Sequence, residues 1–267
     1  DLTIASFMIE SPPFFSQPPI KVLAMANLLA IEAASDSCSV ALHIDDRVIE
    51  RTEAAPRMHS RLLYPMLNEI MGEAGIIPKQ LDAVAFGKGP GSFTGLRIAA
   101  ATAQGIGFAC DLPLIGISTL QAMAQQANFE HHAQQALAIM DARMNELYVG
   151  HYCWDDQSQL MQATINDQIC AQSSTLQDLK IEPSENMMAC GHGLKLTEKL
   201  DSSIQEISKQ DANQVLNASS LLPLALHLFE ANQVLKPENV ELSYLREQSH
   251  WKTIKQQKEF KEQLKKQ

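Results

Sequence analysis

Alternating hydrophobic and polar residues near the start of the chain predict β-strands. The stretch "NLLAIEAA", residues 27–34, is a short apolar run with one acidic residue towards its end, and "CSVALHIDDRVIERTEAA" then alternates around Asp45 and Asp46. A period of two places one face of a strand in the core, and an Asp pair between two such runs is a hairpin signal. We therefore expect two or three antiparallel strands to open the fold.

A four-residue repeat follows and predicts an amphipathic helix in "MHSRLLYPMLNEIMGEAG". Pro65 lies inside it and should kink the helix or lower its stability. A broad apolar stripe usually packs in a core, but methionine-rich faces also suit a partner helix, so both interpretations stay open. The stripe consists of Met58, Leu62, Met66 and Ile70, with Leu63, Leu67 and Met71 beside them.

Strand–helix units follow twice along the rest of the chain. "LDAVAFGKG" predicts a buried strand, the glycine-rich stretch "GKGPGSFTGLR" a loop, and Ile98 to Ala109 a helix of small residues. "LPLIGISTLQAMAQQA" predicts another strand and helix, and "QALAIMDARMNELYVGHYCW" predicts strand, turn and strand. The polar stretch 155–178 is expected to be irregular, "ENMMACGHG" a short strand, and "NASSLLPLALHLFEANQ" a helix capped by Asn217 or Ser219. The pattern favours an α/β protein with two similar lobes.

The expected domain organisation follows from these elements. Residues 25–133 should form the first lobe, 134–214 a second, smaller lobe, and 215–251 a C-terminal helix and segment that packs on both. Residues 1–24 have no initiating Met and two Pro-Pro pairs, so we expect an extension outside the fold. Residues 252–267 form a basic tail.

Composition excludes several classes of protein. The net charge of −10 and a pI of about 5.2 argue against a protein that grips nucleic acid alone. Apolar runs are far shorter than the ~20 residues of a membrane span. Five widely spaced cysteines without a Cys-x-x-Cys pair fit free thiols in a reducing cytoplasm.

The glycine-rich loop is the first candidate for chemistry. Glycines allow close backbone approach, and the start of the following helix attracts anions. A phosphate loop would draw on Gly89, Gly91, Ser92, Thr94, Gly95 and Arg97. The stretch lacks the Gly-Lys-Ser/Thr ending of a P-loop and the Gly-x-Ser-x-Gly of a nucleophile elbow. The alternative is a tight strand-to-helix connection capped by Ser92 or Thr94.

Three acidic residues are candidates for a cleft between the lobes. Glu32 ends the first strand, Asp36 follows four residues later, and Asp141 ends a strand of the second lobe. Together they could hold Mg²⁺ and phosphate, but strand ends and turns commonly carry such acids without a ligand. The histidines show no metal-ligand spacing, since the adjacent His131 and His132 cannot face one ion from one helix. We therefore predict no metal site and no catalytic residue.

Five motifs together resemble the TsaB (YeaZ) family of bacteria. They are "LLAIEAASDSCSVAL", "GKGPGSFTGLR", "GISTLQAMA", "DARMNELY" and "SYLR", in that order between Met25 and Trp251. The resemblance implies a two-lobed fold of the actin/hexokinase/Hsp70-like (ASKHA) kind. It also implies an accessory, non-catalytic subunit of the machinery that makes threonylcarbamoyladenosine at position 37 of tRNA, with TsaD and TsaE as partners.

The same resemblance implies roles for individual positions. TsaD carries a metal-binding His-x-x-x-His pair where this chain has Thr119 and Met123, neither of which can replace an imidazole. The helix with Met58, Leu62, Leu63, Met66, Leu67 and Ile70 is expected to pack against TsaD, or against a second copy when TsaD is absent. No cofactor is expected on this chain alone, although ATP or ADP could bind at the junction with TsaD. Contact with tRNA is expected only through the complex.

Two rival functions use the same fold. One is a nucleotide-dependent kinase or ATPase with Glu32, Asp36 and Asp141 around Mg²⁺, and the other is a glycoprotease-like peptidase. The peptidase fits poorly because the histidine pair is missing. Many relatives also have Ile-Asp-Thr where this chain has Ile31, Glu32 and Ala33, so a hydroxyl that could bind phosphate is absent.

Overall fold

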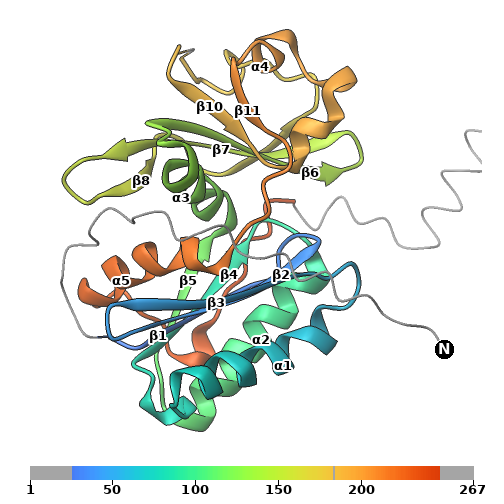
Figure 1. Ribbon diagram of the computed structural model, residues 1–267. Helices are drawn as coiled ribbons and strands as arrows, with labels where there is room; N and C mark the ends of the chain where they lie inside the picture. The colour runs from blue at the N-terminus through green and yellow to red at the C-terminus, as the bar shows by residue number, and fades with distance from the viewer. Residues whose placement is uncertain (1–25, 183, 247–267) are drawn as a thin grey trace, which may run out of the picture.

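Two β-sheets stacked one above the other, with helices between and below them, form the protein (Figure 1). The computed structural model describes residues 26–182 and 184–246. The extension 1–24 and the basic tail 252–267 expected from the sequence lie outside the described residues.

The first sheet has five strands in the order β3-β2-β1-β4-β5. β1 pairs antiparallel with β2, and β2 with β3, while β4 and β5 run parallel to β1. The predicted antiparallel opening is confirmed, and Asp45 and Asp46 form its hairpin turn with φ angles of 49° and 60°. The strands are β1 (Leu28–Glu32), β2 (Ser37–Ile44), β3 (Arg47–Ala54), β4 (Ala83–Gly89) and β5 (Leu114–Ser118).

The second sheet repeats this order with different strands. Its path is β11-β10-β6-β7-β8, and β9 also pairs with β7. The β6–β7 hairpin is confirmed, but the prediction that 155–178 is irregular was wrong, because β8 and β9 both pair with β7 there. The strands are β6 (Gln135–Arg143), β7 (Glu146–Asp155), β8 (Leu160–Ala163), β9 (Gln168–Ala171), β10 (Met187–Cys190) and β11 (Lys209–Asp211).

The two sheets therefore share one topology. If β9, which lies off the path, is left out, each sheet counted from its own first strand has the order 3-2-1-4-5, with an antiparallel side and a parallel side. This repetition confirms the two-lobed α/β fold of the actin/hexokinase/Hsp70-like kind.

Helices fill three layers around the sheets. Figure 1 shows α1 (His59–Ala74) and α2 (Phe93–Cys110) on the outer face of the first sheet. α3 (Thr119–His131) and α5 (Leu222–Glu230) lie between the two sheets, and the short α4 (Ser202–Gln205) lies on the outer side of the second. Short 3₁₀ segments complete the fold at η1 (Pro78–Gln80), η2 (His192–Lys199, kinked at Leu196), η3 (Ala218–Leu221) and η4 (Pro237–Asn239). None of the helices in the described ranges has the length and apolar character needed to cross a membrane.

Apolar side chains divide into three cores that match these layers. One lies between α1, α2 and the first sheet, and a second lies outside the second sheet. The third joins the lobes, since Leu28 and Ala30 of the first sheet share it with Met123 of α3 and Met140 of the second sheet. α3 is buried almost all round, which is typical of a helix enclosed by other elements.

Helix starts follow local capping chemistry. α2 begins at Phe93, five residues earlier than predicted, because the Ser92 side chain accepts a hydrogen bond from the Gly95 amide. Ser118 caps α3 in the same way through the Gln121 amide. The C-terminal helix begins at Leu222 after the turn η3; Asn217 precedes that turn without a side-chain cap, so the predicted cap at Asn217 or Ser219 was wrong.

Candidate functional site

The glycine-rich loop joins the end of β4 to the start of α2. Gly89 has a φ of 104°, a conformation that only glycine adopts without strain, and the backbone then reaches Ser92 at the start of the helix. The chain therefore makes the sharp strand-to-helix turn that the sequence predicts.

The space left by three glycines is filled by the end of β1 and the residues after it. A β-carbon on Gly87 would lie 2.1 Å from Oε2 of Glu32, one on Gly91 would lie 2.6 Å from the Ala34 carbonyl oxygen, and one on Gly95 would lie 1.8 Å from the Ala33 carbonyl oxygen. The Ser92 amide donates to the Ala34 carbonyl oxygen at 2.7 Å. These close approaches serve packing within the chain, and no anion is needed to explain the glycines.

The outer rim of the loop carries the polar candidates. Thr94 and Arg97 are exposed at the start of α2. The Arg97 guanidinium stacks over the Phe93 ring, 3.8 Å from its centroid, and its Nε donates to the Tyr244 hydroxyl at 3.2 Å. Among the residues proposed to bind phosphate, Gly89, Gly91 and Gly95 thus serve the turn and its packing, and Ser92 caps the helix. The Arg97 side chain already interacts with Phe93 and Tyr244. Phosphate binding here stays a prediction.

Glu32 does not line an open cleft. Its side chain is fully buried, Oε1 accepts a hydrogen bond from the Ala34 amide at 2.5 Å, and Oε2 has no hydrogen-bond partner among the described residues. Burial raises the pKa of the carboxyl to about 7, while the Ala34 amide works in the opposite direction. Glu32 is thus buried under Gly87 while Asp36 is exposed, an arrangement that gives little support to a shared Mg²⁺ site.

The other two acids face the junction of the lobes near His192. Asp141 accepts hydrogen bonds from the backbone and side chain of Arg143 at 2.8 and 3.0 Å. The Asp141 amide donates to Nε2 of His192 at 3.3 Å, and Asp36 lies near enough to act on the same ring electrostatically. Burial lowers the pKa of His192, against the opposing pull of Asp141 and Asp36. The ring thus accepts a hydrogen bond as a neutral group, which fits a structural role.

The candidate interface helix splits into two sets of residues. Four members, Leu63, Met66, Leu67 and Ile70, are buried against the chain's own first sheet. Met58 is 44% exposed and Leu62 is half-buried, and Tyr64 of the same helix is 70% exposed. The stripe read from the sequence is therefore mostly core, and the part of the proposed interface that another protein could touch is Met58 and Leu62.

The two positions that match the histidine pair of TsaD lie on α3. Thr119 and Met123 are 0% and 3% exposed. The methyl group of Met123 lies 2.2 Å from where a β-carbon on Gly191 would stand, so this glycine makes room for it. Apolar packing occupies this part of the fold, and no metal-ligand group is present at either position.

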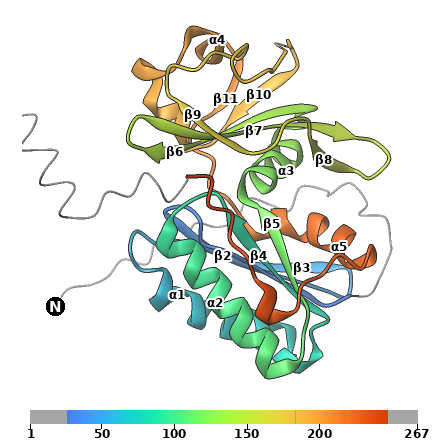
Figure 2. The same cartoon turned by 180° about the vertical axis from the view of Figure 1, so that it is seen from behind.

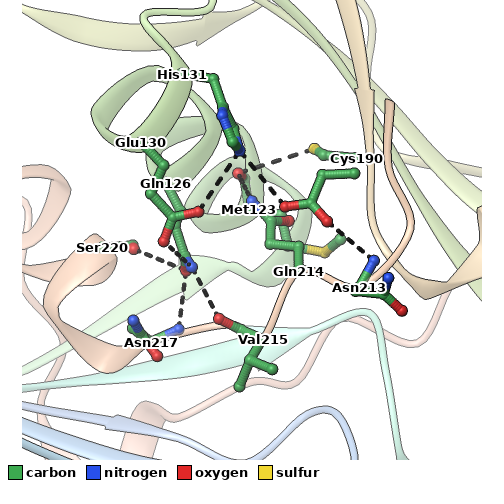
Figure 3. A network of polar contacts seen from close by, with 11 residues as sticks. Met123, Gln126, Glu130, His131, Cys190, Asn213, Gln214, Val215, Asn217 and Ser220 are labelled. Atoms are coloured by element: carbon green, nitrogen blue, oxygen red, sulfur yellow. Dashed lines mark hydrogen bonds and ion pairs between the residues drawn. The ribbon is translucent and has the colours of Figure 1, made fainter. Parts of the chain in front are cut away.

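The sequence did not predict one group of side chains of the types that bind metal ions. Glu130 and His131 at the end of α3 meet Asp211 of β11, with His131 Nε2 3.9 Å from one carboxylate and 3.5 Å from the other (Figure 3). The three ligand atoms lie within 4.8 Å of one another. Burial raises the pKa of Glu130, and the Gln126 side chain opposes that by donating to it. Because 80 residues separate Asp211 from the helix, no local spacing could reveal the group.

A second unpredicted polar group fixes the start of α3. Asp167, between β8 and β9, accepts hydrogen bonds from the Ser118 hydroxyl at 2.5 Å and from the Tyr152 hydroxyl. Burial raises the pKa of Tyr152 well above its usual value, and the Asp167 carboxylate adds to the effect. Gly150 leaves the space for this contact, since a β-carbon there would lie 2.7 Å from Asp167.

Comparisons with known proteins place the chain in a family. The family model of TsaD, described as tRNA N6-adenosine threonylcarbamoyltransferase, matches residues 47–252. The chain is 34% identical to the tRNA threonylcarbamoyladenosine biosynthesis protein TsaB of Haemophilus influenzae, over 85% of this chain and 97% of that protein. It is 33% identical to the TsaB protein of Escherichia coli, over 85% of this chain and 98% of that protein.

A solved structure agrees with the sequence relatives. YeaZ from Pseudomonas aeruginosa is 32% identical, and the match has a TM-score of 0.76 over 83% of this chain and all of that one. The sequence relatives and the solved structure belong to one family, and each match covers most of the chain. The chain therefore belongs to the TsaB (YeaZ) family.

Proposed function

We propose that this chain acts in threonylcarbamoyladenosine biosynthesis as a non-catalytic subunit that binds TsaD. The names of its TsaB relatives support the pathway. The observation that carries the non-catalytic role is the burial of Thr119 and Met123 at the positions that match the TsaD histidines. A shared fold without the ligand groups suits a protein that pairs with the enzyme and stabilises it.

The surface that would meet TsaD begins at Met58 and Leu62. Both lie at the start of α1, where Met58 is 44% exposed and Leu62 is half-buried. An apolar pair at the edge of a helix whose opposite face is buried suits contact with another helix. In isolation the same edge would pair two copies of the chain. ATP or ADP, if bound at all, would lie at the junction with TsaD, and TsaE and tRNA would join through the assembled complex.

The rival kinase or ATPase gains little support. It needs Glu32, Asp36 and Asp141 around Mg²⁺, but Glu32 is buried with a raised pKa and is therefore a poor ligand for the ion. Asp141 is engaged with Arg143.

A reconstitution tests the proposal. Threonylcarbamoylation of tRNA is measured with purified TsaD, TsaE and TsaC, the separate enzyme that the family resemblance implies makes threonylcarbamoyl-AMP. The measurement is made with and without this chain, and ATP hydrolysis by the chain alone is measured beside it. Product that requires the chain, with no hydrolysis by the chain alone, would support an accessory subunit. Equal product without the chain would refute the proposal.

The interface is tested with a matched pair of variants. Leu62→Asp should reduce co-purification with TsaD, because it introduces a charge into an apolar contact. Asn68→Asp adds the same charge at an exposed position of α1 and should leave binding unchanged. Full binding by folded Leu62→Asp would exclude this edge of α1.

A further inference from the structure

The motif "SYLR", residues 243–246, lies at the end of the described chain and touches both lobes. After α5 the chain runs along the first lobe and then up to the second, as the red segment of Figure 2 shows. Its course is fixed by contacts at successive points, and each belongs to a different part of the fold.

The first contacts hold the segment against the first lobe. Leu235 forms two backbone hydrogen bonds with Leu114 of β5, at 2.7 and 2.8 Å. Gln104 of α2 then donates to the Pro237 carbonyl oxygen at 2.7 Å. The segment thus lies against both a strand and a helix of the first lobe before the motif begins.

The motif itself starts on the glycine-rich loop. The Ser243 amide donates to the Lys88 carbonyl oxygen at 2.7 Å, and its own carbonyl oxygen would lie 2.9 Å from a β-carbon on Gly89. Tyr244 accepts a hydrogen bond from Arg97, and its ring centroid lies 5.7 Å from that of Phe93. The chain's own C-terminal segment therefore contacts both the loop and the start of α2.

Two residues later the motif reaches the second lobe. Arg246 donates to the Ala142 carbonyl oxygen at 3.1 Å and to the Met144 sulfur at 3.4 Å, and it forms an ion pair with Glu146. Its side chain is only 14% exposed, so solvent screens these contacts less than it screens a surface pair. Met144 lies in the tight turn between β6 and β7, while Ala142 is near the end of β6 and Glu146 begins β7.

The backbone of that turn is left-handed at three consecutive residues. Arg143, Met144 and Asn145 have φ angles of 66°, 55° and 62°, in the left-handed region where residues other than glycine are strained. The Arg246 side chain binds the residues on either side of this turn and one within it. A planar guanidinium with five donors can hold several acceptors at once in one fixed geometry.

We propose that residues 243–246 form a strap that fixes the orientation of the two lobes, with Arg246 as its attachment to the second lobe. Because the strap is formed within one chain, this proposal does not depend on whether the chain binds TsaD. Its removal leaves the chain folded but lets the lobes move relative to one another and loosens the β6–β7 turn.

Spin-label distances between the lobes test the strap. Labels go on Lys79→Cys in the first lobe and Gln177→Cys in the second, both at exposed positions, after Cys110, Cys153 and Cys170 are replaced by alanine. Cys38 and Cys190 stay because they are buried, and burial raises the pKa of the Cys38 thiol to about 12. The unaltered strap should give one narrow distance distribution, and Arg246→Ala should broaden or shift it.

Two further variants keep the test decisive. Arg143→Ala removes an arginine next to the same turn whose side chain is 82% exposed and forms an ion pair with Asp141, and it should leave the distribution narrow. Glu146→Gln keeps Arg246 in place but removes its ion-pair partner, and it should broaden the distribution even if Arg246→Ala fails to fold. Distributions for folded Arg246→Ala or Glu146→Gln that match the unaltered protein would overturn the strap.

Discussion

The carboxylate of Glu32 occupies the space that a side chain on Gly87 would need, with Oε2 2.1 Å from the position of that β-carbon. An acid at the end of the first strand and a glycine before the loop thus depend on each other. The pair explains why Glu32 is buried and why a bulkier residue at position 87 would displace it.

This burial predicts a pH-dependent stability. The pKa of Glu32 is about 7 in the folded protein and 4.5 as its ordinary value. Between those two values the unfolded chain releases the proton while the folded chain retains it, so the free energy of unfolding falls as pH rises. Relative to Glu32→Gln, the wild type should lose about 3 kcal/mol between roughly pH 4 and pH 8.

Urea denaturation of both proteins across that range measures the difference. The other ionisable groups are the same in the wild type and in Glu32→Gln, so their contributions to the pH dependence cancel in the difference. Parallel pH profiles would show that Glu32 titrates as an ordinary exposed carboxylate, in conflict with its burial.

Two glycines of α2 should respond in opposite ways to alanine. A β-carbon on Gly95 would lie 1.8 Å from the Ala33 carbonyl oxygen. A β-carbon on Gly105 would have no described atom within 4 Å beyond its chain neighbours and the backbone of its own helix. Gly95→Ala should lower the free energy of unfolding by at least about 2 kcal/mol, because backbone must move. Gly105→Ala should raise it by roughly 0.5–1 kcal/mol through helix propensity. Chemical denaturation checks both, and equal effects would mean that the loop does not pack tightly on residues 33 and 34.

The two halves of the α1 stripe should also differ. Met66 is 4% exposed in the core beneath the helix, while Leu62 is half-buried at its edge. Met66→Asp should cost roughly 3–5 kcal/mol, since it buries an unpaired charge and leaves space behind. Leu62→Asp should cost only about 1 kcal/mol. Thermal unfolding followed by circular dichroism separates the two, and similar melting temperatures would contradict the assignment of faces.

Asp167 should couple the start of α3 to the second sheet. Tyr152→Phe removes one of its hydroxyl donors and should cost roughly 1–2 kcal/mol. Ser118→Ala removes the other donor together with the helix cap, at a cost of about 1–2 kcal/mol. A double-mutant cycle should give an interaction of at least about 0.5 kcal/mol, because both donors serve one carboxylate. Strict additivity would show that the two hydroxyls act independently.

Local patterns predicted the regular elements well. Alternation around Asp45 and Asp46 gave the first hairpin, since both the turn residues and the strand period are encoded within a few positions. The four-residue repeat gave α1, including a helix that continues through Pro65. Neither pattern says what covers an apolar face. Four of the six residues proposed for the partner interface therefore lie in the chain's own core.

Distant pairings could not be predicted in the same way. β8 and β9 are four residues long and partly polar, and they are strands because β7 offers each of them a backbone partner. Glu130, His131 and Asp211 meet only because the fold brings the end of α3 next to β11. The glycine-rich loop gave the correct turn, but the use of its free space by residues 32–34 emerges only in three dimensions.

The place of α3 limits how this protein can be dissected. The helix follows β5 directly, yet apolar residues from both sheets surround it. A fragment that ends at residue 133 would carry an apolar helix with half of its surroundings missing, and a fragment that begins at 134 would expose the sheet that the helix covers. Separate expression of either piece should yield aggregated material, and mixing the two should restore solubility only if they refold around the shared helix.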